Sequence, residues 1–247
     1  MIFGYLIFRS IVLLIDIIFI GILVTYLFRL KLFLEVRIAT GVLIGMLIFG
    51  VSMFAISYFL GLNMLGLIIF IIIANFLSIK YLATDGISKI RVEWLDLKRR
   101  FNELSWKFFF LVLGVFTIIF GYLAFQLLTF PNGRYIVQPL HAYGDISLHL
   151  GIISSFAFGN NFPPESPILS GTKISYPFLI DFITAVFVNP LSLRFDQAIA
   201  LVGVLMMAVS IILLAYFSLK VTGNKLAACL VLVLFFFNGG LGFFYIF

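Results

Sequence analysis

The sequence predicts an all-α fold, a polytopic transmembrane helix bundle, and two features of its composition carry that prediction. Of the 247 residues, 64% are apolar and only 11% are charged, whereas a soluble domain is nearer half apolar and a quarter charged. The apolar residues also gather in runs long enough to cross a bilayer as helices. The net charge of +6 is interleaved with these runs, so it indicates membrane topology and not binding to nucleic acid.

Six apolar runs have the ~20 residues that a spanning helix needs. They cover residues 10–28, 38–60, 64–82, 107–128, 197–219 and 226–247. A shorter apolar run at 177–189 begins at Pro177 and carries Asp181. It predicts a re-entrant or juxtamembrane piece that needs protein cover to satisfy its backbone.

The lysine and arginine residues predict the orientation of the bundle. Twelve of the 16 basic residues fall in three stretches that share one side when the six spans alternate, namely 29–37, 80–107 and 220–225. The other four are Arg9, Arg134, Lys173 and Arg194. By the positive-inside rule the richer side is the cytoplasm. The long polar loop 129–196 is therefore expected on the extracytoplasmic side of the cell membrane.

The stretch 84–106 predicts a cytoplasmic amphipathic helix. Its apolar residues recur at spacings of three and four, at Ile87, Ile90, Trp94, Leu97, Phe101 and Leu104. Opposite charges four residues apart support a helix, and they are Lys89 with Glu93, Asp96 with Arg100, and Arg99 with Glu103. We expect the helix to lie on the membrane surface; the alternative is a docking helix for a partner. It separates a three-helix unit at 1–83 from a core at 107–247.

Both histidines of the chain lie within four residues of one aspartate in the outer loop, in the segment His141-Ala-Tyr-Gly-Asp145-Ile-Ser-Leu-His149. Helical spacing of the following apolar residues predicts a juxtamembrane helix at 145–158 with Asp145 as its N-cap. His149 follows one turn later on the same face. Asp145 is thus a candidate general base, or a ligand with His149 for a divalent cation. The alternatives are a simple cap and an interfacial histidine without a task, and His141 is expected to be a bystander.

Other polar residues of the outer loop are further site candidates. Glu165, flanked by prolines that stiffen the loop, is either a second carboxylate of the site or a solvated loop residue. Lys173 and Arg194 could grip a lipid phosphate or anchor helix ends by snorkelling. Asp181 is a site candidate by its depth, or a hydrogen-bonding group of a re-entrant turn. Asp16, midway along the first run, is a site candidate by the same argument, but a buried hydrogen bond to a neighbouring helix is the preferred interpretation.

The order of the parts from Lys107 onward resembles a known family. A spanning run leads to a loop with Gly144-Asp145 and a juxtamembrane helix, and then to the turn Tyr176-Pro177-Phe178-Leu179 and the segment Asn189-Pro-Leu-Ser-Leu-Arg194. The next spanning run ends in Lys220-Val-Thr-Gly-Asn-Lys225. Residues 107–247 resemble in this order the N-terminal part of the GT-C glycosyltransferases, which include protein O-mannosyltransferases and aminoarabinose transferases.

This resemblance implies that Asp145 is the catalytic or metal-organising carboxylate of the first outer loop. It also implies that Tyr176, in the place of the family's Pro-Pro-Leu turn, helps to bind substrate. Ile146 follows Asp145 where the family often has a second acid, so Glu165 or Asp181 is expected to substitute.

The predicted function is that of an integral-membrane glycosyltransferase, which moves a sugar from a polyprenyl-phosphate donor in the membrane lipid to an unknown acceptor on the outer face. Asp145 would take the acceptor's proton, His149 would orient Asp145 or share a cation (Mg or Mn) with it, and Lys173 with Arg194 would neutralise the departing phosphate. The alternatives are a transporter or flippase, with ionisable groups at mid-membrane depth, and a non-catalytic assembly subunit. The last apolar run ends without a polar tail, so a truncated chain is expected.

Overall fold

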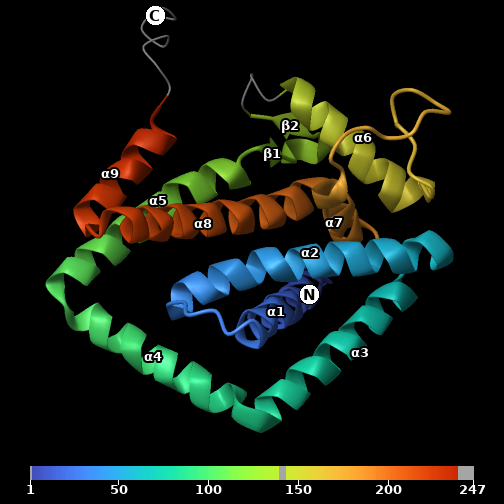
Figure 1. Ribbon diagram of the computed structural model, residues 1–247. Coiled ribbons are helices and arrows are strands. Elements are labelled where there is room, and N and C mark those ends of the chain that lie inside the picture. The colour runs from blue at the N-terminus through green and yellow to red at the C-terminus, as the bar shows by residue number, and fades with distance from the viewer. Residues whose placement is uncertain (1, 139–142, 239–247) are drawn as a thin grey trace, which may run out of the picture.

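The computed structural model describes residues 2–138 and 143–238, and it is an all-α helix bundle, as the sequence predicts (Figure 1). The helices are α1 (Ile2–Leu27), α2 (Leu34–Leu60), α3 (Met64–Tyr81), α4 (Ile87–Asn102), α5 (Leu104–Phe125), α6 (Tyr143–Gly159), α7 (Leu179–Val188), α8 (Phe195–Thr222) and α9 (Lys225–Phe236), with a π-helical turn at Leu82–Gly86 and a 3₁₀ turn at Pro131–Gly133. Two short antiparallel strands, β1 (Leu128–Thr129) and β2 (Ile136–Val137), follow α5.

Within the described residues, five helices are long and apolar enough to span a membrane: α1 from Phe8 onward, α2, α3, α5 and α8. The chain is therefore a multi-pass membrane protein by the length and composition of its helices. The sixth predicted span is described only as the 12 residues of α9, and residues 239–247 of that run lie outside the described residues.

The two short elements predicted around the outer loop are also helices. The predicted piece at 177–189 is α7, and its residues 181–188 are all buried, which is the protein cover that such a segment requires. The predicted helix at 145–158 is α6, which begins at Tyr143. Because the backbone is already helical at Tyr143, Asp145 lies in the first turn and is not the N-cap; His141 lies outside the described residues.

Helices α1 and α2 touch backbone to backbone at glycine positions. A methyl group added to Gly45 of α2 would lie 1.9 Å from the carbonyl oxygen of Ile17, and one added to Gly21 of α1 would lie 1.8 Å from that of Gly41. Small residues four apart on one helix permit such an approach in a membrane, where van der Waals contact drives helix association. The α1–α2 hairpin is thus a tightly packed pair.

Helix α2 also connects this hairpin with the rest of the bundle. One apolar core unites buried residues of α1, α2, α3, α6, α7 and α8, and a second unites those of α5, α8 and α9. The second core includes Trp106, Phe109 and Tyr216. Helix α8 contributes to both cores, so the helices on either side of the predicted boundary at 84–106 pack against one another.

Helix α4 is the amphipathic helix that the sequence predicts, and buried ion pairs tie it to α2. Arg37 of α2 binds Glu93 at 2.8 Å, while Arg100 of α4 binds Glu35 of α2. The predicted pair of Asp96 with Arg100 is present at 2.9 Å. The apolar stripe of α4 is exposed, including Ile87, Trp94, Phe101 and its continuation Leu104, so a lipid surface can cover it.

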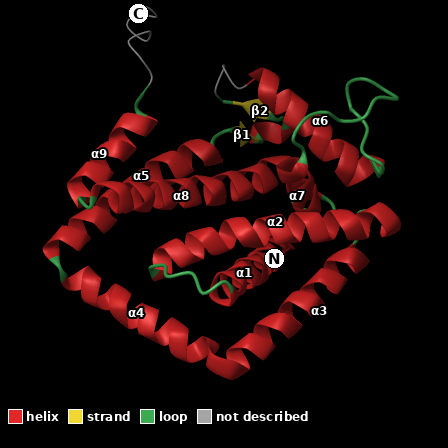
Figure 2. Ribbon diagram, in the orientation of Figure 1, coloured by secondary structure: helices red, strands yellow, loops and turns green. Residues whose placement is uncertain are grey.

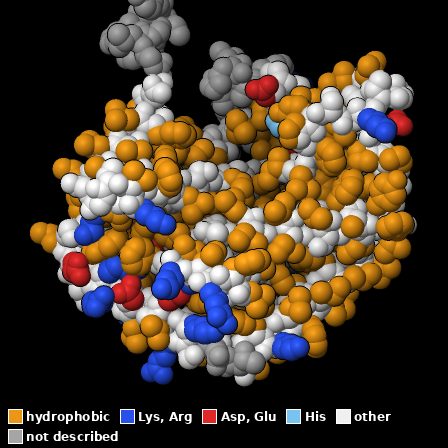
Figure 3. All heavy atoms as spheres, in the orientation of Figure 1, with side chains coloured by type: hydrophobic (Ala, Val, Ile, Leu, Met, Phe, Trp, Pro, Cys, Tyr) orange, Lys and Arg blue, Asp and Glu red, His pale blue; other side chains and the backbone are white. Residues whose placement is uncertain are grey.

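The loops and the charges divide between two ends of the bundle. The longest loop joins α6 to α7 and lies with the β1–β2 hairpin at one end, whereas α4 and the α1–α2 turn lie at the other (Figure 2). Lys and Arg side chains gather over α4 and the α1–α2 turn, while apolar side chains cover most of the visible surface between the ends (Figure 3). Most residues of the predicted outer site lie on α6, on α7 and in the loop between them, at the first of these ends.

Replacing Gly45 with alanine is expected to destabilise the bundle by about 1–3 kcal/mol, because the new methyl group must push α1 away. The matched control is Gly114→Ala on α5, where an added methyl group has no neighbour within 4 Å. That control should leave stability unchanged or raise it by up to ~1 kcal/mol, since alanine favours a helix over glycine. Thermal unfolding in detergent measures both, and equal melting temperatures for the two variants would contradict the close contact.

Candidate functional site

A cluster of five phenylalanine rings fixes α6 and α7 against α2. Their ring centroids lie 5.3–6.5 Å apart, and the cluster consists of Phe54 of α2, Phe156 of α6, Phe162 and Phe178 of the loop, and Phe182 of α7. Phe156 and Phe182 are fully buried. Aromatic pairs at such distances add about 0.5–1.5 kcal/mol each beyond their burial. The neighbouring polar side chains of α6 and α7 are therefore held in a defined arrangement.

The imidazole of His149 on α6 and the carboxyl group of Asp181 on α7 are hydrogen-bonded beside this cluster. The Nδ1 nitrogen of His149 lies 2.8 Å from one carboxylate oxygen of Asp181 and 3.0 Å from the other. Since a carboxylate accepts, Nδ1–H donates, which leaves Nε2 as the nitrogen able to take a proton. The side chain of Asp181 is 5% exposed and that of His149 27% exposed. The carboxylate is thus enclosed, while the imidazole remains accessible.

The surroundings of the pair shape its chemistry. Burial raises the pKa of the Asp181 carboxyl above its ordinary value, and the charge and hydrogen bond of His149 offset part of that rise. Tyr176 packs its ring edge-to-face against His149 with centroids 5.6 Å apart, and it is itself exposed. A buried carboxylate that orients an accessible imidazole is an arrangement suited to proton transfer.

Asp145 lies on α6 one turn before His149, and its side chain is exposed. Among the described residues no hydrogen bond or ion pair engages its carboxylate. The Nδ1 nitrogen of His149 is bonded to Asp181, a residue 32 positions away in sequence. The pairing of Asp145 with His149 therefore stays a prediction.

The predicted cation site is not completed by the described side chains, which contain no group of three or more His, Cys, Asp and Glu residues placed to hold a metal. Asp145 and His149 would supply two ligands, whereas Mg²⁺ prefers an octahedron of oxygen atoms. The divalent cation therefore stays a prediction, and no chemical step proposed for the site depends on it.

Glu165 and Lys173 lie together in the α6–α7 loop. Their backbones form an antiparallel bridge, and the side-chain amide of Asn161 clamps the backbone of Glu165 by two hydrogen bonds of 2.8 Å each. Both side chains are exposed. The loop thus presents an acidic and a basic residue at paired backbone positions.

Arg194 caps the start of α8 and lines an apolar cavity. Its guanidinium binds Asp196 at 3.0 and 2.8 Å and lies 4.9 Å from the centre of the Phe130 ring. The cavity of about 710 Å³ is lined by α1, the end of α5, β1 and α8, with Arg194, Asp196 and Gln197 among its few polar residues. Sequence reasoning missed Asp196 and this cavity, because neither produces a motif.

No family model matches the chain, and no match was found among curated proteins or among solved structures. The function must therefore be inferred from the residues of the chain and from their geometry. The strongest features at this end are the His149–Asp181 pair and the apolar cavity beside Arg194.

Asp181→Asn is expected to change the pH dependence of stability. The raised pKa means that, above the ordinary value of 3.8, the folded protein holds a proton that the unfolded chain has lost. The free energy of unfolding of the wild type therefore falls as the pH rises through this window. The melting temperature of the wild type minus that of Asp181→Asn should decrease over the same window, measured in detergent.

The control for this experiment is Thr184→Ser, at a buried position one turn along α7 without a group that titrates near neutral pH. The difference in melting temperature between Thr184→Ser and the wild type should not vary with pH. If the difference in melting temperature between the wild type and Asp181→Asn were equally independent of pH, the pKa of Asp181 would not be raised.

Proposed function

We propose that this chain is an integral-membrane glycosyltransferase that moves a sugar from a polyprenyl-phosphate donor to an acceptor hydroxyl at the extracytoplasmic face. The observation that supports this most is the accessible imidazole of His149, held at 2.8 Å by the buried carboxylate of Asp181. An imidazole oriented by an enclosed carboxylate is a general base that several unrelated enzyme classes use. Activation of an acceptor hydroxyl requires such a base.

In the proposed reaction the acceptor hydroxyl gives its proton to Nε2 of His149 while its oxygen forms a bond to the anomeric carbon. The bond between that carbon and the phosphate oxygen breaks on the opposite face, and polyprenyl phosphate leaves with the electron pair. Asp181 stabilises the positive charge that develops on the imidazole, because its carboxylate already accepts the Nδ1 proton. The proton thus moves to His149, the sugar to the acceptor oxygen, and the electron pair of the broken bond to polyprenyl phosphate.

Asp145 is the second acid–base group of the proposal. It projects from the same helix one turn before His149 and faces solvent, where it can accept a hydrogen bond from the incoming acceptor. The resemblance to GT-C enzymes favours Asp145 as the base itself. The two assignments of the general base, to His149 or to Asp145, predict different losses of sugar transfer when each residue is replaced.

The donor lipid is proposed to approach from the bilayer beside Arg194. The cavity of about 710 Å³ is mostly apolar and lies against α1 and α8, which suits part of a polyprenyl chain. Arg194 borders it and shares its charge with Asp196, and Lys173 of the α6–α7 loop is a second candidate cation. Both can help to neutralise the leaving phosphate. The cationic end of the molecule lies opposite (Figure 3), so the positive-inside rule supports an extracytoplasmic position for this site.

A transporter or flippase is the second candidate, and Asp16 favours it. This carboxylate lies within the spanning part of α1 and interacts with Asn75 of α3. Its Oδ2 atom is buried and has no hydrogen-bond partner among the described residues. An ionisable group at such a depth commonly marks a path for ions or polar solutes.

Membrane vesicles that contain the protein, supplied with a labelled polyprenyl-phosphate sugar, test the proposal. His149→Ala and Asp181→Asn should each lower the rate of transfer by about 10²–10⁴-fold at unchanged protein abundance, because each removes part of the base. Glu103→Gln, an exposed acid at the opposite end, is the control and should keep the wild-type rate. Wild-type transfer in both site variants would refute the role of the pair.

The same assay separates the remaining alternatives. If Asp145→Asn abolishes transfer while His149→Ala retains it, Asp145 is the base. Solute flux without any transfer, lost in Asp16→Asn, would establish the transporter and overturn the glycosyltransferase proposal.

A further inference from the structure

The α6–α7 loop contains a small ordered turn, residues 165–173, which we call the clip. Its base is the antiparallel bridge between the backbones of Glu165 and Lys173. Next to this bridge, the N–H of Ser166 donates to the carbonyl oxygen of Thr172 at 2.8 Å. The clip therefore has two short arms that run side by side, and its tip lies between them at residues 167–171.

The tip of the clip is held by hydrogen bonds of its own. The N–H groups of Ile168 and Leu169 both donate to the hydroxyl oxygen of Ser166 at 3.3 Å. The hydroxyl of Thr172 donates to the carbonyl oxygen of Leu169 at 2.7 Å, a local bond typical of turns. Gly171 has φ of 75°, in the left-handed region that glycine adopts without strain. These polar groups of the tip are bonded inside the clip, which lowers the cost of moving the tip out of water.

The tip presents two large apolar side chains outward. Ile168 is 76% exposed and Leu169 is 62% exposed. The tip sequence Ser166-Pro-Ile-Leu-Ser-Gly-Thr172 has no charged residue, and the charged residues of the clip, Glu165 and Lys173, form its base. Single exposed apolar residues are common on protein surfaces. Here two adjacent ones stand at the end of a turn whose polar groups are bonded inward, so the position of the clip in the molecule decides what covers them.

Contacts with α2 place the base of the clip beside the membrane. Asn160 begins the loop, and a methyl group added to Gly61 would lie 2.9 Å from the side-chain oxygen of Asn160. Gly61 is the residue that ends the spanning helix α2. The side chain of Asn161 bonds the backbone of Glu165 twice, which connects the start of the loop to the base of the clip. The base therefore lies near the level at which α2 leaves the apolar layer.

The adjoining end of α2 has the side chains expected at that level. Tyr58, Phe59 and Leu60 are exposed, Phe59 by 83%, and aromatic residues are frequent where a spanning helix meets the lipid headgroups. The α6–α7 loop and the α2–α3 turn lie at the same end of the bundle (Figure 1). The bilayer that surrounds this end of α2 is therefore the nearest apolar medium for the tip of the clip.

We propose that the clip is a membrane anchor. Ile168 and Leu169 enter the lipid leaflet next to the α2–α3 turn, because apolar side chains gain free energy by leaving water. Glu165 and Lys173 stay among the headgroups, where Lys173 can extend its ammonium group to a lipid phosphate. The order from charged base to apolar tip follows the order from headgroups to acyl chains, which favours lipid over a water-soluble partner. The anchor holds the α6–α7 loop against the membrane, and it does not depend on sugar transfer.

Electron paramagnetic resonance of a spin label at Leu169→Cys tests the proposal in the full chain, reconstituted in phosphatidylcholine vesicles. Cys229→Ala first removes the single native cysteine, which is buried. The label should collide more often with oxygen, which concentrates in lipid, than with a water-soluble nickel chelate. The control is Arg134→Cys, at an exposed position in the β1–β2 turn of the same end, and its label should collide more often with the nickel chelate.

Two results of this experiment would overturn the anchor. A preference for the nickel chelate at both positions would place the tip of the clip in water. Collisions with neither reagent at Leu169→Cys would place the tip against protein, either a second copy of the chain or a partner.

A second pair of variants tests the apolar character of the tip. Ile168→Asp, combined with the label at position 169, should shift the label's collisions from oxygen to the nickel chelate, because a charge is costly in lipid. Ser175→Asp adds the same charge at an exposed position outside the clip and should leave the label unchanged. Both variants should melt at the wild-type temperature in detergent, since both side chains are exposed. If Ile168→Asp left the label's preference for oxygen unchanged, the tip would not be an anchor.

Discussion

The backbone contact between α1 and α2 at Gly21, Gly41 and Gly45 is the constraint on which both ends of the molecule depend. It holds α2 in the middle of the bundle, where a further glycine, Gly50, lets α7 approach closely: an added methyl group would lie 2.8 Å from Ile183. In a bilayer, where lipid competes with side chains for apolar contact, such close packing is the main attraction between helices. Helix α2 is therefore the rigid element from which the polar groups at either end are positioned.

At one end of α2, Phe54 packs against the rings of α6 and α7, and this contact brings His149 to Asp181. At the other end, Glu35 and Arg37 bind Arg100 and Glu93 of α4. The same helix thus supports the His149–Asp181 pair at one end of the bundle and the ion pairs with α4 at the other. One packed core connects α1 and α2 with α6 and α7. A change in the distance between α1 and α2 would therefore alter the packing at both ends of α2.

Much of the architecture follows from the sequence, because apolar runs and helical spacing determine helices wherever lipid is the solvent. The apolar runs predicted the five spanning helices and the short segment that is α7, and the spacing predicted α4 and α6. The polar contacts could not be predicted in the same way. Periodicity relates residues on one helix, so it placed Asp145 next to His149, whereas the hydrogen bond to Asp181 depends on the packing of α6 against α7. The four-residue spacing of Gly41 and Gly45 is a sequence signal for close helix contact in a membrane, whereas the charged residues carry no information about that contact.

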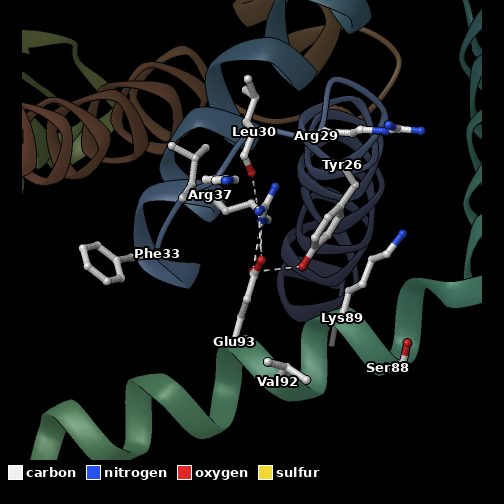
Figure 4. A pocket seen from close by; sticks show the side chains of 11 residues that line it. Tyr26, Arg29, Leu30, Phe33, Arg37, Ser88, Lys89, Val92 and Glu93 are labelled. Atoms are coloured by element: carbon white, nitrogen blue, oxygen red, sulfur yellow. Dashed lines mark hydrogen bonds and ion pairs between the residues drawn. The ribbon is translucent and has the colours of Figure 1, made fainter.

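The crossed ion pairs between α2 and α4 explain why α4 is more than a surface helix. An amphipathic helix needs only lipid to cover its apolar stripe, and that stripe is exposed here. Buried ion pairs add little net stability, since desolvation offsets their attraction, but breaking one is costly because it leaves a buried charge alone. Two such pairs of opposite polarity, Arg37 with Glu93 and Arg100 with Glu35, permit one register of α4 on α2. That register keeps α4 beside the α1–α2 turn, where residues of both line one cavity (Figure 4).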